Sequence, residues 1–328
     1  GAIMEYVKLG NTGMEVSKLC LGCMGFGEPE RGREKWSIGE TESREVIKKA
    51  LESGINFFDT ANLYSAGSSE EIVGKALKDF ANRDEIVLAS KLYFPMFDGP
   101  NAKGLSRKSI FAEIDHSLKR LQTDYLDLYI IHRWDYGTPI EETMEALHDL
   151  VKMGKVRYIG ASSMHAWQFA KAQFIAEKNG WTKFVSMQNL YNLLYREEER
   201  EMIPLLQDQK VAMTPWSPLA GGRLTRDIGA ITARASQAVQ ADLPAYIVAS
   251  DNEVISRVHK LADERGITRG QVATAWMLSK DYVTAPLIGA TKVKYLDDAL
   301  GAFDVALSAE EIKYLEEAYV PRNITGYR

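Results

Sequence analysis

The chain has 328 residues, of which 45% are hydrophobic and 26% are charged. This composition is typical of a folded protein with a large core, and it excludes disorder as the main state of the chain. The net charge is −5 and no run of basic residues reaches five, so we do not expect a nucleic-acid binder. No apolar run approaches the roughly 18 residues that span a bilayer, so we expect no membrane partner.

The first residues carry no charged-then-apolar signal segment, which predicts a cytoplasmic protein. Gly1 to Ile3 precede Met4 and are expected to be a cloning remnant, so the folded domain is predicted to cover residues 4–328. The outward positions of the predicted helices are charged, which favours a monomer.

Short β-branched or aromatic runs alternate with amphipathic stretches along the chain, and no linker interrupts them. The predicted strands cover residues 19–25, 55–61, 86–91, 125–132, 156–162, 184–188, 211–216 and 285–289. The predicted helices cover residues 41–52, 69–78, 107–120, 139–152, 166–178, 196–209, 253–264, 269–279 and 293–300. Eight strand–helix units predict an α/β fold, a single-domain (β/α)8 TIM barrel.

Three further segments complete this expectation. Residues 6–9 and 15–18 predict a β-hairpin ahead of the first barrel strand, placed to close the bottom of the barrel, and residues 308–318 predict an extra C-terminal helix. The connection from about 220 to 250 carries no predicted element, and its length favours a functional loop that covers a cofactor. The competing doubly wound fold needs Gly-x-Gly-x-x-Gly at the start of a helix, and the glycines at 22–27 have the wrong order for it.

The two cysteines, Cys20 and Cys23, have the spacing of a redox pair or of half a metal site. A structural zinc site needs four ligands, but the sequence has no second cysteine pair and its five histidines show no ligand spacing. We therefore predict two buried, reduced thiols and no metal.

Four ionisable residues stand at the ends of three neighbouring predicted strands. Asp59 and Tyr64 follow the second strand, Lys91 ends the third and His132 ends the fourth. Because these strand ends face the active-site mouth of an α/β barrel, we expect the four side chains to lie together. A carboxylate would keep Lys91 charged, and this cation would lower the pKa of the Tyr64 phenol and make it a better general acid.

The same residues resemble the catalytic tetrad of the aldo-keto reductases. The similarity rests on Phe-Asp-Thr-Ala-x-x-Tyr at 58–64, Ser-Lys at 90–91 and Ile-His at 131–132, and it extends over nearly the whole chain. Segments at 20–28, 131–136 and 195–202 look closest to the bacterial YajO-type branch. The resemblance implies NADPH-dependent reduction of aldehydes or ketones. In it Tyr64 is the proton donor, Asp59 and Lys91 tune its pKa, and His132 orients the carbonyl.

The resemblance also implies a site for NADP(H). Ser162, Ser163 and Gln188 stand where the family holds the nicotinamide carboxamide, with Ser163 in place of the usual asparagine, and Trp216 is expected to stack on the nicotinamide. The implied pyrophosphate loop contains Ser217, Leu219, Gly221, Gly222 and Arg226. The implied adenosine-phosphate segment contains Gly289, Thr291, Lys292 and Asp298.

Within that segment, Lys292 and Thr291 are expected to hold a 2′-phosphate, which favours NADPH over NADH. Asp297 and Asp298 replace the Glu-Asn pair that is common in the family.

An aromatic wall is expected around the substrate. Trp36, Tyr93, Phe94 and Trp134, together with Trp216, predict a pocket for aryl or medium-chain carbonyl compounds. Two other functions stay open. Potassium-channel β subunits share the fold and tetrad, so an NADP(H)-binding redox sensor is the alternative, whereas a Schiff-base lyase would need a neutral lysine that Asp59 opposes.

Overall fold

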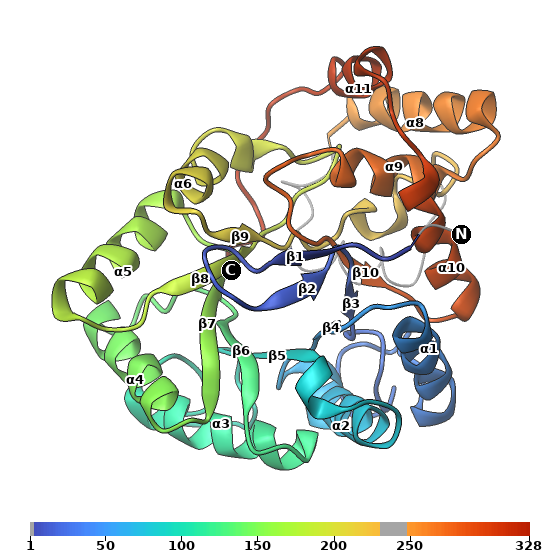
Figure 1. Ribbon diagram of the computed structural model, residues 1–328. Coiled ribbons are helices and arrows are strands. Elements are labelled where there is room, and N and C mark those ends of the chain that lie inside the picture. Colours follow the sequence, from blue (N-terminus) through green and yellow to red (C-terminus); the bar gives the residue numbers. More distant parts are fainter. Residues whose placement is uncertain (1–2, 230–247) are drawn as a thin grey trace.

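The structure is a computed structural model, and it describes residues 3–229 and 248–328 (Figure 1). Within these ranges eight parallel strands form the centre of the fold, and each pairs with its neighbour in the order β10-β3-β4-β5-β6-β7-β8-β9. They are β3 (Cys20–Gly22), β4 (Phe57–Asp59), β5 (Val87–Leu92), β6 (Leu126–Ile131), β7 (Val156–Ser162), β8 (Phe184–Gln188), β9 (Ala212–Met213) and β10 (Leu287–Gly289).

Backbone hydrogen bonds close this sheet into a ring. Thr284 N donates to Met213 O and Leu287 N donates to Pro215 O, both at 2.9 Å, so the segments at β9 and β10 are joined. The predicted (β/α)8 barrel is therefore confirmed.

Helices lie around the outside of the ring (Figure 1). They are α1 (Glu40–Glu52), α2 (Ser68–Phe80), α3 (Arg107–Leu121), α4 (Ile140–Lys152), α5 (Ala166–Asn179), α6 (Met202–Gln209), α8 (Asp251–Arg265), α9 (Arg269–Leu278), α10 (Val293–Gly301) and the terminal α11 (Ala309–Glu316). Their apolar faces bury the outer side of the sheet in one large core, while a second cluster of apolar side chains, which includes Phe57 and Leu128, fills the barrel. Side-chain caps such as Ser106, Thr268 and Ser308 begin several of these helices.

One predicted helix is wrong. Residues 196–209 form not a continuous helix but the 3₁₀ turn η3 (Glu197–Glu199) followed by α6. Pro204 explains the break, because proline has no backbone N–H and its ring excludes the carbonyl four residues earlier. The three glutamates of η3 therefore lie outside α6, and two of them, Glu197 and Glu198, are buried.

The N-terminal hairpin closes one end of the barrel, as predicted (Figure 1). Its strands β1 (Tyr6–Lys8) and β2 (Glu15–Ser17) are antiparallel, and Leu9 and Val16 are fully buried in the inner cluster. At the turn, Gly10 has a φ of +61° and its backbone lies against β8 and β9. The hairpin thus seals the amino ends of the strands and leaves their carboxyl ends for a site.

The long connection falls partly outside the described residues, which omit 230–247 of the predicted 220–250 loop. In the described part of the chain, no helix has the length and apolar character that a membrane crossing needs.

Candidate active site

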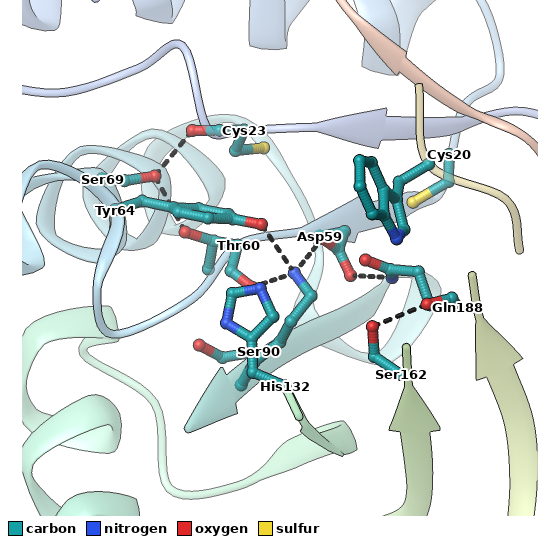
Figure 2. Close-up of polar contacts among 12 residues, drawn as sticks. Cys20, Cys23, Asp59, Thr60, Tyr64, Ser69, Ser90, His132, Ser162 and Gln188 are labelled. Atoms are coloured by element: carbon teal, nitrogen blue, oxygen red, sulfur yellow. Dashed lines mark hydrogen bonds and ion pairs between the residues drawn. The ribbon is translucent and has the colours of Figure 1, made fainter. Parts of the chain in front are cut away.

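The four predicted residues meet at the carboxyl ends of β4, β5 and β6. Asp59 ends β4, Lys91 lies in β5, His132 directly follows β6, and Tyr64 opens the 3₁₀ turn η1 (Tyr64–Gly67) (Figure 2). Residues at the ends of adjacent parallel strands share one edge of the sheet, which is why residues 73 positions apart in the sequence come together here.

Lys91 is the centre of this cluster, and none of its side chain is exposed. Its ammonium donates a short hydrogen bond to Asp59 Oδ1, one of 2.8 Å to Thr60 O and one of 3.2 Å to Tyr64 Oη. Burial alone would lower the pKa of Lys91, but the Asp59 carboxylate and the Tyr64 phenol together raise it above its ordinary value. The lysine is therefore a permanent cation, as the sequence predicts.

Tyr64 is likewise buried, and burial raises the pKa of its phenol. Lys91 acts in the predicted downward direction, but desolvation outweighs it, so the pKa of Tyr64 lies above the ordinary value rather than below it. The predicted effect of Lys91 is therefore present, but the net shift is upward, and Tyr64 is held in its protonated form.

His132 is kept neutral. Burial lowers the pKa of the imidazole well below its usual value, and the charges of Arg133 and Lys91 lower it further. Its ring meets those of Phe94 and Tyr64 edge to face, with centroids 4.9 and 5.9 Å away. Nδ1 is buried and has no hydrogen-bond partner among the described residues.

The turn after Tyr64 is strained and supported from outside. Ser65 and Ala66 have φ of 47° and 53°, a left-handed conformation that is unfavourable for residues with a Cβ. The Glu34 carboxylate accepts a hydrogen bond of 3.0 Å from Ser65 N, and Gly32 packs directly against the Ser65 backbone. These contacts fix where the Tyr64 phenol points.

Polar residues of β7 and β8 continue the site away from Tyr64. Ser162 Oγ donates to Gln188 O at 2.6 Å, and Gln188 Nε2 donates to Asp59 Oδ2 at 3.0 Å (Figure 2). Trp216 Nε1 donates to Ser163 Oγ at 3.1 Å. Ser162, Ser163, Gln188 and Trp216 are thus brought together beside Asp59.

The segment after Trp216 is a tight loop. Ser217, Ala220, Gly221 and Gly222 all have positive φ, and the N–H groups of Ala220 and Gly222 donate to carbonyls of the same loop at 3.0 and 3.1 Å. A Cβ on Gly221 would meet no atom of the described residues within 4 Å. Leu219 and the exposed Arg226 belong to the same loop.

The start of α10 has features that suit an anion. Gly289 is the exposed end of β10, and Thr291 and Lys292 lead into α10, whose first turn has no side-chain cap. Uncapped N–H groups and an exposed lysine suit a phosphate. Asp298 lies further along α10 and accepts a hydrogen bond of 2.6 Å from Thr268, so its carboxylate fastens α10 to the start of α9.

Three parts of the site together suit a dinucleotide. The buried amide and hydroxyl groups at β7 and β8 would face a carboxamide, and the loop at 217–222 and the start of α10 would face its phosphates.

An aromatic cavity of about 250 Å³ lies next to Phe94, which contacts His132. The cavity is lined by Tyr93, Phe94, Pro95, Lys103, Trp134, Tyr136, Tyr327 and Arg328. The predicted Tyr93 and Trp134 are therefore brought together here. Trp36 does not line this cavity but lies against Gly25, beside Thr291.

Sequence reasoning missed several residues that border the site, above all Asn189, Glu198 and Tyr327. Glu198 is 2% exposed, and burial raises its pKa to about 7 even though Tyr327 and Asn189 hydrogen-bond to it. A run of three glutamates carries no local signal of burial. The one signal for Glu198 in the sequence is its position within residues 195–202, a segment that carries part of the family resemblance.

The two cysteines are free and buried, as predicted, and burial raises the pKa of both thiols. In the described ranges, no group of three His, Cys, Asp or Glu residues is arranged to hold a metal ion.

Comparison with known proteins agrees with this geometry. Residues 18–320 match the model of the Aldo/keto reductase family. The chain is 46% identical to a versiconal hemiacetal acetate reductase of Aspergillus parasiticus, and the match covers 98% of each chain. It is also 46% identical to a putative aryl-alcohol dehydrogenase of Schizosaccharomyces pombe, over 98% of this chain and 97% of the relative.

A third relative, an aldo-keto reductase of Alternaria alternata, is 45% identical over 98% of this chain and 93% of its own length. The barrel and these similarities define an oxidoreductase that acts on carbonyl or alcohol groups of small molecules. More narrowly, the chain belongs to the aldo/keto reductase family, whose members generally use a nicotinamide cofactor.

Proposed function

We propose that this protein reduces aldehydes and ketones to alcohols with NADPH. The observation that carries the proposal is the buried contact of Lys91 with both Asp59 and Tyr64. When bound, NADPH supplies a hydride to the carbonyl carbon, and the carbonyl oxygen then needs a proton. Among the described residues, the Tyr64 hydroxyl lies beside the charged pair formed by Lys91 and Asp59, and it can donate that proton.

Tyr64 is the proposed donor. The phenol is protonated at neutral pH, and Lys91 opposes the rise in pKa that burial causes, which favours release of the proton. After the transfer, the phenolate faces the Lys91 ammonium at 3.2 Å, which stabilises the negative charge. Asp59 keeps that ammonium charged and in place, while neutral His132 orients the carbonyl oxygen.

The same proposal assigns the cofactor contacts. Ser162, Ser163 and Gln188 would hold the carboxamide, and Trp216 would stack on the nicotinamide ring. The pyrophosphate would lie on the loop with Ser217, Leu219, Gly221 and Arg226, and the adenosine phosphate near Gly289, Thr291, Lys292 and Asp298. Preference for NADP(H) over NAD(H) rests on Lys292, whose charge would be matched only by a 2′-phosphate.

Aryl carbonyl compounds are the proposed substrates, because aromatic rings form most of the cavity. The relatives named for versiconal hemiacetal acetate and for aryl alcohols support this choice. Trp36 stays a predicted substrate contact. A domain over 4–328, a monomeric state, a cytoplasmic location and closeness to a bacterial branch also stay predictions, and the relatives described above are fungal.

The test is NADPH oxidation with benzaldehyde at neutral pH, for wild type and Tyr64→Phe. Loss of the general acid should lower kcat by about 10²–10⁴, while the Kd for NADPH stays within about twofold because no proposed cofactor contact is removed. Tyr6→Phe, in the hairpin at the other end of the barrel, serves as control and should behave as wild type.

Unchanged turnover by Tyr64→Phe would exclude Tyr64 as the acid. Tight NADPH binding with no turnover of any aldehyde would instead support the redox-sensor alternative.

A further inference from the structure

The C-terminal segment at residues 322–328, called the tail below, is fastened to the barrel by polar contacts. The Arg322 guanidinium pairs with both oxygens of the fully buried Asp251, which Arg223 also contacts at 2.9 Å. Thr325 N donates to Tyr195 Oη at 3.1 Å. The tail is thus bonded first to α8 and then to the segment that follows β8.

The end of the tail reaches the site on two sides. Gly326 has a φ of +83° and its Cα lies so close to Trp216 that a Cβ would be 3.2 Å from the indole. Tyr327 and Arg328 line the aromatic cavity, and the Tyr327 ring meets His165 edge to face with centroids 4.8 Å apart. The tail is therefore at once a wall of the cavity and a backing for Trp216.

A single carboxylate joins these two sides. Tyr327 Oη donates a short hydrogen bond to Glu198 Oε1, and Asn189 Nδ2 donates one of 2.5 Å to Oε2. The other end of the Asn189 amide accepts a hydrogen bond of 2.7 Å from Ser163 N. Ser163 has a φ of 55°, so its backbone needs such a restraint, and its hydroxyl receives the Trp216 indole N–H.

The buried Glu198 carboxyl group is an energetically unfavourable way to hold the tail alone. Burying a carboxyl group costs free energy even when it is hydrogen-bonded, and an apolar side chain of similar size would fasten a tail more cheaply. Hydrogen bonds fix direction as well as distance, which apolar packing does not. A buried carboxyl at this point therefore suits a group that sets the orientation of both partners.

We propose that Glu198 is a positioning residue that couples the Tyr327 wall of the substrate cavity to the Ser163–Trp216 pair through Asn189. The inference rests on the proposed function, because it takes the cavity as the substrate site and Trp216 as the nicotinamide platform. Glu198 does not touch the reacting atoms. Its carboxylate holds both Tyr327, a wall of the cavity, and Asn189, which restrains the Ser163–Trp216 pair.

Three variants separate the two arms of this link. Glu198→Leu removes both hydrogen bonds, and Tyr327→Phe removes only the arm to the tail. Glu198→Gln retains both, because its carbonyl can accept from Asn189 and its amide can donate to the Tyr327 oxygen. Glu201→Gln, an exposed glutamate three residues away, is the matched control.

Steady-state kinetics with NADPH are measured for 2-naphthaldehyde, whose rings suit the aromatic lining of the cavity, and for propanal, which has no ring to place there. In both Glu198→Leu and Tyr327→Phe, we expect KM for naphthaldehyde to rise about tenfold, with a smaller change in kcat and in the constants for propanal. Only Glu198→Leu should also raise the Kd for NADPH, by about tenfold, because only this variant releases Asn189. Glu198→Gln should restore wild-type values to within about threefold, and Glu201→Gln should match wild type.

Equal losses on both aldehydes, or no rescue by Glu198→Gln, would overturn the proposal and leave Glu198 a residue of general stability. An unchanged Kd for NADPH in Glu198→Leu would overturn the arm through Asn189. Failure of the wild type to reduce either aldehyde would count against the proposed function instead. Hydrogen exchange at the Thr325 amide and the Kd for NADPH then decide the link, since both should change in Glu198→Leu and neither in Glu201→Gln.

Discussion

Lys91 shows how one residue governs the electrostatics of its neighbours. A buried ammonium costs several kcal/mol unless its charge is paired and its protons are hydrogen-bonded, and here all three protons have oxygen partners. The same charge lowers the pKa of Tyr64 and of His132, although burial is the larger effect on both. The outcome is one fixed cation beside a protonated phenol and a neutral imidazole.

The neutral state of His132 gives the residue-scale prediction. The unfolded chain protonates this imidazole near pH 6.5, whereas the folded protein does so only at a much lower pH. Unfolding therefore takes up a proton below pH 6.5. The stability that His132 contributes is full above that pH and is lost as the pH falls toward the folded-state pKa.

We expect His132→Asn to remove a slope of up to about 1.4 kcal/mol per pH unit from the free energy of unfolding between pH 6.5 and 5. Urea unfolding at half-unit pH intervals measures it. His116→Asn, which changes an exposed histidine on α3, is the control and should keep the wild-type slope. Identical slopes for wild type and His132→Asn would show that His132 is not buried in its neutral form.

At the scale of elements, the sequence pattern predicted which strands and helices form better than it predicted where they begin and end. All eight strands were found, because runs such as 126–131 are apolar except for one residue, Asp127, and are bounded by turns. The segment at 196–209 was misread, since its composition favours a helix and only Pro204 opposes it. Tyr327 could not have been predicted, because its partner Glu198 lies 129 residues away and no local pattern encodes that contact.

The hairpin gives the element-scale prediction. Gly10→Ala should destabilise the fold by about 1–3 kcal/mol, because the left-handed φ is strained for alanine and the new Cβ would lie 2.7 Å from Val185 O. Gly13, in the same turn, has nothing within 4 Å of its Cβ position. Gly13→Ala should therefore change the urea midpoint little, and an equal effect of both substitutions would contradict the proposed fit of the turn against β8.

For the whole molecule, the tetrad was predictable because barrel topology converts the ends of β4, β5 and β6 into one site. The direction of the Tyr64 pKa shift was not, because desolvation depends on side chains that close over the ring from elements distant in sequence. The proposed cofactor contacts are also spread from β7 to α10, so a bound cofactor should connect many elements of the barrel.

Binding of NADPH should therefore stabilise the whole chain. At 100 times its Kd, a ligand that binds only the folded state contributes about 2.7 kcal/mol, which corresponds to an increase in Tm of about 4 °C for a chain of this length. Lys292→Ala should reduce the increase given by NADPH but leave that given by NADH, because only NADPH carries the 2′-phosphate that Lys292 is proposed to hold. Lys171→Ala, an exposed lysine on α5, is the control. Thermal unfolding at several concentrations of each cofactor measures both, and an equal reduction for NADPH and NADH would exclude Lys292 from recognition of the 2′-phosphate.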